Sequence, residues 1–265
     1  MENLPRRLAR LSTTAVAELL AGSVAPCAIV PIGAIEAHGA HAPLGADNFI
    51  AEAVAEQFAL ACDGVLCPTI PAGVLNVGYE FDHMPGSISM TARTLLDFIS
   101  GYGSELGRNG FDPIVFVNAH GPNSHPLAIA AFEIHRSTGA QVGVLEWWSA
   151  ARDVIEQIKG FAYANHGDQI ETSLMLASAG ADAVDLDRAE VKEVRLEALD
   201  EAERSVYLRK LTFTHRFDQR WVGETGNMGD PTRATAEAGQ RIIAATVDVG
   251  LELVEALRSQ AERHR

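Results

Sequence analysis

The sequence predicts an α/β protein in which a mostly parallel sheet is covered by helices on both faces, a three-layer α/β/α arrangement. Short apolar runs that end in Gly, Pro or polar residues alternate with alanine-rich stretches of helical spacing, a pattern typical of parallel strands joined by helices. The 265 residues, of which 47% are hydrophobic, suffice for one large core. Because no repeat or Pro/Gly-rich linker divides the chain, residues 1–265 are expected to form a single domain.

The first half of the chain contains one clear strand and two helices. Residues 27–32 form a short apolar run that ends before a glycine, which indicates a buried strand. Residues 47–62 are alanine-rich and favour a helix. Residues 91–109 carry apolar side chains at helical spacing and predict a second helix.

The second half repeats this alternation. Residues 113–118 and 141–146 are apolar runs that predict strands, and residues 125–138 between them predict a helix. A last long helix is expected over roughly residues 232–259. The stretch 182–211 alternates in charge, and we interpret it as a solvated or interfacial excursion without chemistry.

Charge and cysteine content disfavour several classes of function. The formal charge of −14 argues against nucleic acid and anionic membranes as partners, because both require cations that neutralise phosphates. No apolar run approaches the roughly 18 residues of a membrane span, and no signal peptide is recognisable, so a cytoplasmic location is expected. Cys27, Cys62 and Cys67 are too few for a disulfide framework and are expected to be reduced core residues.

A group of potential metal ligands follows the first strand. The stretch that begins at Gly33 carries Glu36, His38, His41 and Asp47. Glu36 and His38 face the same side of an extended chain, and Asp47 at the start of the next helix can return toward them. Carboxylates with imidazoles suit zinc, manganese or iron(II), and the two oxygens of Asp47 can bridge a pair of ions.

Two later clusters add candidates at the same edge of the sheet. His120 follows strand 113–118, and the carboxyl ends of parallel strands share an edge. In the run His166-Gly-Asp-Gln-Ile-Glu-Thr-Ser, Glu171 can complete the ligand set of a second ion, which leaves His166 for proton transfer.

Each of these residues also has a simpler interpretation. A single His near a Gly is more often a loop residue, Glu36 alone more often caps a helix or forms an ion pair, and Glu171 can serve as a helix-dipole partner. The metal interpretation depends on the joint occurrence of these residues after strands, in a chain with nine histidines.

The same residues carry a resemblance to the creatininase family. The family motif after the first strand contains a Glu, two His, a Pro-Leu pair and an Asp, which fall in register here. Further family segments recur in order, and the resemblance covers roughly residues 25–240. It implies the creatininase-like fold, two divalent metal ions and a homo-oligomer, commonly a hexamer. The matching positions are Glu36, His38, His41, Pro43, Leu44 and Asp47, followed by segments that begin at His83, Asn118, His166 and Gly229.

Two departures from the family pattern bear on the site and the substrate. Creatininase carries a metal-binding Glu two residues after the strand-end His, where this chain has Pro122, and no acid precedes His166, where Asn165 stands. Glu171 is therefore expected to supply the second ion's carboxylate, with Asp168 as its competitor. The resemblance implies hydrolysis of a non-peptide amide C–N bond by metal-activated water, in a lactam, cyclic urea or imide, or in a formamide.

The remaining assignments concern proton transfer and substrate contacts. His166 is expected to carry a proton to the leaving nitrogen, because imidazole titrates near neutral pH. Asn123 is expected to bind the developing oxyanion or, equally, to cap the following helix. His41 is a further candidate for a substrate contact.

Three tryptophans offer an apolar wall for the substrate. Trp147 and Trp148 follow the third strand and form either a lid or, as paired tryptophans more often do, a core or subunit contact. Trp221 is a third candidate. His125 and Tyr79 are possible polar groups of the pocket, although each is more often ordinary surface.

Two other functions are compatible with this pattern. A catalytically inactive, metal-binding oligomeric protein would keep the scaffold, but the joint presence of the ligands and His166 argues against it. A metallopeptidase that trims a small peptide would use the same centre, and the acidic composition argues mildly against that alternative.

Overall fold

A five-stranded parallel sheet forms the centre of the molecule. The computed structural model describes residues 4–75, 84–160, 166–192, 201 and 224–263. The strand order is β1-β3-β2-β4-β5, and every neighbouring pair runs parallel. The strands are β1 (Arg6–Arg7), β2 (Ala28–Ile32), β3 (Val65–Leu66), β4 (Ile114–Asn118) and β5 (Val142–Glu146).

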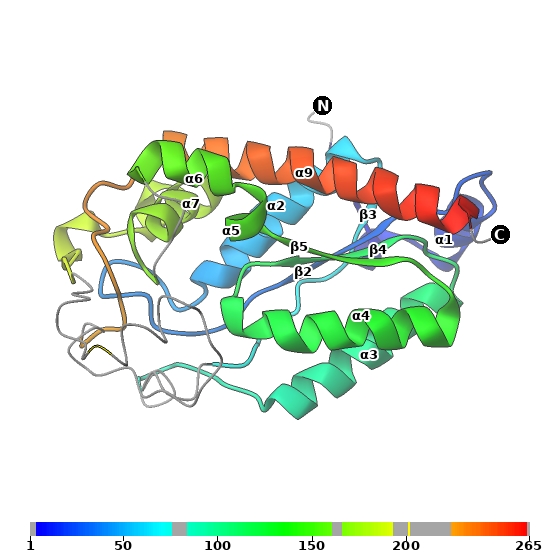
Figure 1. Cartoon of the computed structure of the whole chain (residues 1–265), viewed down its shortest axis with the longest axis horizontal. Helices are drawn as coiled ribbons and strands as arrows, with labels where there is room; N and C mark the ends of the chain where they lie inside the picture. The colour runs from blue at the N-terminus through cyan, green and yellow to red at the C-terminus, as the bar shows by residue number, and fades with distance from the viewer. Residues whose placement is uncertain (1–3, 76–83, 161–165, 193–200, 202–223, 264–265) are drawn as a thin grey trace.

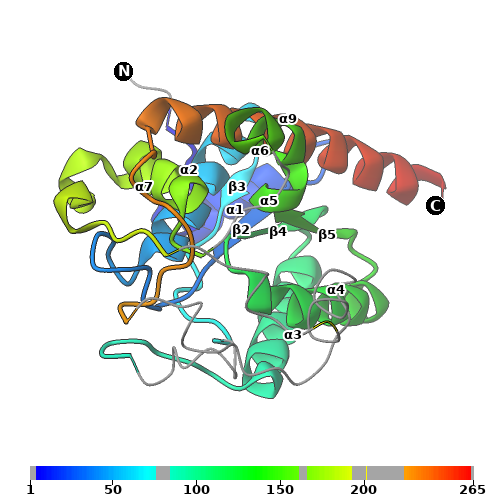
Figure 2. The ribbon, with the colours of Figure 1, turned by 60° about the vertical axis from the view of Figure 1, so that its left-hand side comes forward.

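Helices cover both faces of this sheet, as Figure 1 shows. On one face α9 lies along the sheet beside α2, α6 and α7, and on the other face α3 and α4 pack against each other. The turned view in Figure 2 shows the strands between these two layers. The helices are α1 (Thr13–Leu20), α2 (Ala46–Ala61), α3 (Ala92–Arg108), α4 (Ser124–Thr138), α5 (Trp147–Ala150), α6 (Arg152–Lys159), α7 (Gln169–Ala179) and α9 (Ala236–Arg263).

Successive residues of each central strand belong to different halves of the core. In β4, Val115 and Val117 pack in the cluster shared with α2, α7 and α9, whereas Ile114 and Phe116 pack in the cluster shared with α3 and α4. This alternation follows from the period of two along a strand. Because helices cover both faces, β2 and β4 are buried at every position and read as continuous apolar runs.

The predicted three-layer α/β fold is confirmed. The three predicted strands and four predicted helices appear with bounds within a few residues of those expected. The very short strands β1 and β3 and the helices α1, α5 and α6 were not predicted, since two-residue strands lack a periodic pattern. Of the stretch 182–211, the part that the structure describes contains two short 3₁₀ helices, and most of the remainder lies outside the described residues. Within the described ranges, no helix combines the length and apolar character that a bilayer span requires.

Candidate metal centre

The carboxyl ends of β2 and β4 bring the first candidate ligands together. The two strands pair in register, from Ala28 with Ile114 to Ile32 with Asn118, so both strands end at the same edge of the sheet. Glu36 follows β2 and His120 follows β4. The first turn of α2 adds Asp47, and α2 is held on the sheet by its fully buried Ile50 and Phe58.

Glu36, Asp47 and His120 form one compact group of ligand atoms. Nδ1 of His120 lies 2.9 Å from Oδ2 of Asp47 and 3.1 Å from Oε1 of Glu36. The other ring nitrogen, Nε2, lies 2.8 Å from the carbonyl oxygen of Val74. All three side chains are almost completely buried, and their ligand atoms fall within 4.8 Å of one another.

His38, Asp47 and Glu171 form a second group that shares Asp47 with the first. Nε2 of His38 lies 3.2 Å from Oδ1 of Asp47 and 3.7 Å from Oε2 of Glu171. Its Nδ1 lies 3.0 Å from the carbonyl oxygen of Glu36. Asp47 therefore presents one carboxylate oxygen to each group, which is the arrangement of a bridging ligand.

The hydrogen bonding of the histidines fits a bound cation. His38 and His120 each place one nitrogen against a backbone carbonyl, which must accept that nitrogen's proton, so the inner nitrogen of the neutral ring carries a lone pair. This lone pair faces carboxylate oxygens, and a cation between them removes the repulsion. Among the described residues, Nε2 of His38 and Oδ2 of Asp47 are buried without a hydrogen-bond partner. The donor set of imidazoles and carboxylates thus suits a divalent metal ion.

The electrostatics of the site also favour positive charge. Burial lowers the pKa of His38, but the carboxylates of Asp47, Glu171 and Glu36 outweigh it and raise that pKa to about 10. Burial and the surrounding negative charge raise the pKa of Glu171 to about 8, against the opposing effect of His38. The carboxylates therefore favour a cation at the centre, either as protonated histidines or as a bound metal ion.

His166 stands slightly farther from the carboxylates than the other two histidines. Its Nε2 lies 2.7 Å from the carbonyl oxygen of Ala37, and its Nδ1 lies 3.6 Å from Oε1 of Glu36 and 3.8 Å from Oε2 of Glu171. Its ring centroid is 4.2 Å from that of His38. Nδ1 also forms a third possible ligand group with Glu36 and His38. The structure thus places His166 at the site, where its side chain can either bind a metal ion or transfer a proton.

A capped turn at the start of α7 supplies Glu171. Asp168 is the N-cap, and its Oδ1 accepts hydrogen bonds from the backbone N–H groups of Ile170 at 2.8 Å and Glu171 at 3.3 Å. Oε2 of Glu171 accepts the N–H of Gly167 at 2.6 Å. Gly167 has a φ of +60°, and a Cβ at this position would lie 2.6 Å from the carbonyl oxygen of His38. Only glycine allows the backbone at residue 167 to adopt this φ and to lie so close to the backbone of His38 without strain.

Two predicted substrate contacts have internal roles in the structure. Asn123 is fully buried: its Nδ2 donates to the carbonyl oxygen of Gly33 at 3.0 Å and its Oδ1 accepts the N–H of Val74 at 3.1 Å. Asn123 occupies the N-cap position of α4, but its side chain makes no cap hydrogen bond and instead ties Gly33 to Val74, while its predicted contact with the oxyanion stays a prediction. His41 is also buried, with Nε2 3.0 Å from Oγ1 of Thr172, and burial together with His38 lowers its pKa to about 4.

The tryptophan pair packs against the core. Trp147 is 3% exposed and belongs to the hydrophobic cluster beneath α9, so it makes the core contact that was one of its two predicted roles. Trp148 is half-buried, meets Trp147 edge to face, and packs against the same cluster. His125 is exposed on α4. Tyr79, His83 and Trp221 lie outside the described residues.

Sequence reasoning missed the partners that orient the candidate ligands. Lys159 at the end of α6 pairs with Asp168, and backbone carbonyls of residues 36, 37 and 74 accept the outer N–H groups of the histidines. No local pattern marks a lysine or a carbonyl for such a role.

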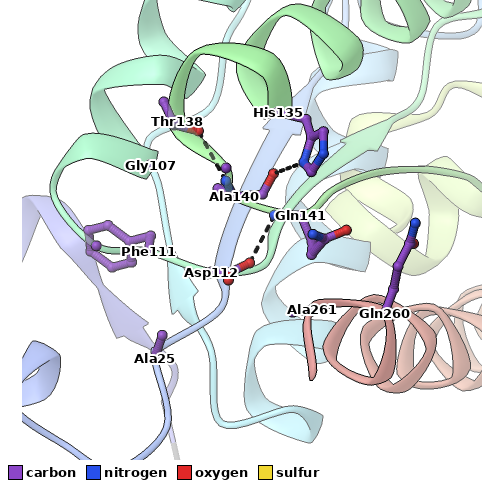
Figure 3. Close-up of a pocket in the computed structure, with 12 residues that line it drawn as sticks. Ala25, Gly107, Phe111, Asp112, His135, Thr138, Ala140, Gln141, Gln260 and Ala261 are labelled. Atoms are coloured by element: carbon purple, nitrogen blue, oxygen red, sulfur yellow. Dashed lines mark hydrogen bonds between the residues drawn. The ribbon is translucent and has the colours of Figure 1, made fainter. Parts of the chain in front are cut away.

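A sizeable cavity elsewhere in the molecule does not belong to this centre. A volume of about 620 Å³ is lined by residues just before β4 and β5 and by residues at or just beyond the ends of α3, α4 and α9, on the side opposite the carboxyl ends of the strands. Figure 3 shows Asp112, which accepts the N–H of Gln141 at 2.9 Å, among its lining residues. None of the candidate ligands lines it.

Comparison with known proteins places this geometry in a family. Residues 9–254 match the family model Creatininase, described as creatinine amidohydrolase. The chain is 32% identical to the mycofactocin precursor peptide peptidase of Mycolicibacterium smegmatis, over 85% of the chain and 83% of that relative. It is 33% identical to the creatinine amidohydrolase of Pseudomonas putida, over 60% of the chain and 66% of that relative.

Solved structures show the same relationship. A structure titled "Creatininase Mn" is 25% identical, with a TM-score of 0.77 over 97% of this chain and 98% of that one. A second creatininase structure, 23% identical, reaches a TM-score of 0.80 over 96% and 98% of the two chains and shows the shared fold. The family match over nearly the whole chain and the identity to these relatives show that this chain is a hydrolase of the creatininase family.

Proposed function

We propose that the chain is an amidohydrolase that cleaves an amide C–N bond at a centre of two divalent metal ions. The observation that carries this proposal is the position of Asp47, which presents one oxygen to Glu36 and His120 and the other to His38 and Glu171. Zinc, manganese or iron(II) fits this donor set. When bound, such ions supply Lewis acidity and lower the pKa of a water molecule.

The protein residues divide into two ligand sets and one proton carrier. Glu36, Asp47 and His120 hold one ion, and His38, Asp47 and Glu171 hold the other. Glu171 thereby provides the carboxylate that Pro122 does not. Asp168 is unsuited to that role, because its two oxygens cap α7 and pair with Lys159.

His166 is the proposed proton carrier. The bond from Nε2–H to the carbonyl of Ala37 fixes the tautomer and leaves the lone pair on Nδ1, directed at the site. Nδ1 stands 3.6 Å or more from the nearest carboxylate oxygens, against about 3 Å for the inner nitrogens of His38 and His120. The added distance supports a role in accepting a proton and passing it to the leaving nitrogen.

For the substrate, we propose a non-peptide and cyclic amide, of the lactam, cyclic urea or imide type. The match to the creatinine amidohydrolase of Pseudomonas putida supports this class, since creatinine is a cyclic amide. A second candidate is a small peptide. It is supported by the mycobacterial relatives named mycofactocin precursor peptide peptidase, which match over a larger share of the chain.

The experiment is a hydrolysis assay of the chelated and reloaded protein. Metal-free protein, and protein reloaded with manganese, zinc or iron(II), is incubated with lactams, cyclic ureas, imides, formamides and short peptides. We expect turnover of one class only, lost on chelation and restored by metal. Asp97→Ala, which removes an exposed carboxylate on α3, is the control for non-specific effects of metal. Full metal loading without turnover of any class would favour the inactive metal-binding protein instead.

A further inference from the structure

A buried ion pair connects α6 to the turn that carries His166 and Glu171. Lys159, the last residue of α6, pairs with Oδ2 of Asp168. The Lys159 side chain is 10% exposed and that of Asp168 is 1% exposed. Exposed ion pairs contribute little, but the loss of one partner of a buried pair leaves an uncompensated charge. This pair is therefore of the kind whose removal changes the local structure.

Asp168 passes this restraint on to Glu171. While Oδ2 faces Lys159, Oδ1 accepts the N–H groups of Ile170 and Glu171 and so fixes the first turn of α7. The N–H of Gly167, next to Asp168, donates to Oε2 of Glu171. Both the backbone and the carboxylate of Glu171 are thus held by a turn whose N-cap is anchored by Lys159.

In the part of the chain that the structure describes, the other half of the centre is held by different elements. Glu36 and His120 follow the paired strands β2 and β4, and Asp47 lies on α2, which packs on the sheet. Within the described residues, neither Lys159 nor Asp168 belongs to the group formed by Glu36, Asp47 and His120. A substitution at Lys159 is therefore expected to disturb the group of His38, Asp47 and Glu171 more than the group of Glu36, Asp47 and His120.

We propose that Lys159 is a positioning residue for the second metal position, formed by His38, Asp47 and Glu171, and that it leaves the first position unaffected. Without Lys159, Oδ2 of Asp168 loses the ammonium group that holds it, and the carboxylate can rotate away from the first turn of α7. This rotation weakens the cap and lets Glu171 move from its place opposite His38. This inference rests on the proposed two-metal function.

The test is a titration of each metal position in the purified full-length chain. Manganese content and affinity are measured in the presence of a competing chelator for the wild type, Lys159→Met and Lys159→Arg. We expect Lys159→Met to bind the second equivalent roughly 10–100-fold more weakly, the range for loss of a partner that orients a ligand, while the first equivalent keeps its affinity. Lys159→Arg keeps the charge and should recover most of the second-site affinity.

A matched control and a second variant complete the design. Arg7→Met removes a half-buried cation that pairs with Glu52 and Glu56 on α2, and it should leave both affinities unchanged. If Lys159→Met does not fold by circular dichroism, Asp168→Asn, which removes the charge at almost constant volume, should give the same selective loss.

The possible outcomes separate this inference from the proposed function. Unchanged affinity for the second equivalent, or equal weakening of both equivalents, in a folded variant would overturn the role of Lys159. A wild-type chain that binds fewer than two ions would overturn the proposed function, on which the inference depends.

Discussion

The two halves of the candidate metal centre are built by different means. Glu36 and His120 lie just beyond two central parallel strands that pair over five residues each, and Asp47 lies on a helix with a deeply buried face. Glu171 and His166 come from a turn that is held by a helix cap, a glycine of positive φ and the Lys159–Asp168 ion pair. The first half depends on the hydrophobic core, and the second on a few polar contacts.

Because of this difference, the two halves should respond to different substitutions. The first half should respond to loss of core packing, and the second to loss of a single polar contact. Ligands attached to the sheet move only when the core is disturbed, because packed interiors do not deform continuously. Ligands on the α7 turn shift when one hydrogen bond or charge is lost. Substitutions in the two halves should therefore produce distinct patterns of metal loss.

The largest expected effect concerns His166, the one site residue assigned to proton transfer. His166→Ala should keep both ions and the fold but lower kcat by the roughly 10²–10⁴-fold that general acid–base catalysis supplies. Metal content and turnover are measured on one preparation. A fall in metal content in step with turnover would assign His166 to the ligands, consistent with its place near Glu36 and His38.

A pair of glycine substitutions compares the two halves directly. A Cβ at Gly33 would lie 2.7 Å from the backbone N of Asn48 and displace the start of α2, so Gly33→Ala should weaken binding of both ions through Asp47. Gly167→Ala forces a positive φ on alanine, at a cost of about 1–3 kcal/mol, and should weaken only the ion held by Glu171. Metal titration of both variants checks this. The same pattern of loss in both would remove the distinction between the halves.

The smallest effect on catalysis is expected at Asn123. Asn123→Ala breaks its bonds to Gly33 and Val74 and leaves the buried carbonyl of Gly33 unpaired, which costs about 1–3 kcal/mol of unfolding free energy. Because the side chain is fully buried and both of its amide atoms are already hydrogen-bonded, KM should stay near the wild-type value. Chemical denaturation measures the free energy of unfolding, and steady-state kinetics measure KM. A large rise in KM with unchanged stability would instead support the predicted substrate contact.

The strand-derived half of the centre was the more predictable from sequence. Apolar runs that end at glycine or asparagine locate β2 and β4, and strand ends of a parallel sheet share one edge, so Glu36 and His120 had to meet there. His166 and Glu171 were candidates by residue type alone, because no predicted strand ends directly before them, and the family resemblance supported their placement. Both pairs are brought together in the structure.

Other features depended on contacts that no local pattern encodes. Asn123 has the sequence context of a helix cap, yet its side-chain amide forms hydrogen bonds with the backbone of Gly33 and Val74, which belong to two distant segments. Trp147 follows a strand end, a position that favoured a lid, but it packs in the same buried cluster as residues of α9 from the far end of the chain. Lys159 lacked any sequence signal, and its partner Asp168 was considered only as a competitor of Glu171 for the second ion.

The central claim is that Asp47 joins two metal positions, and a count of bound metal tests it most directly. Wild type, Asp47→Ala and the control Asp97→Ala are loaded with manganese, freed of excess by gel filtration and analysed by inductively coupled plasma mass spectrometry. We predict two ions per chain in the wild type and in the control, and none in Asp47→Ala, because one carboxylate serves both positions. Full occupancy in a folded Asp47→Ala would contradict the bridging role.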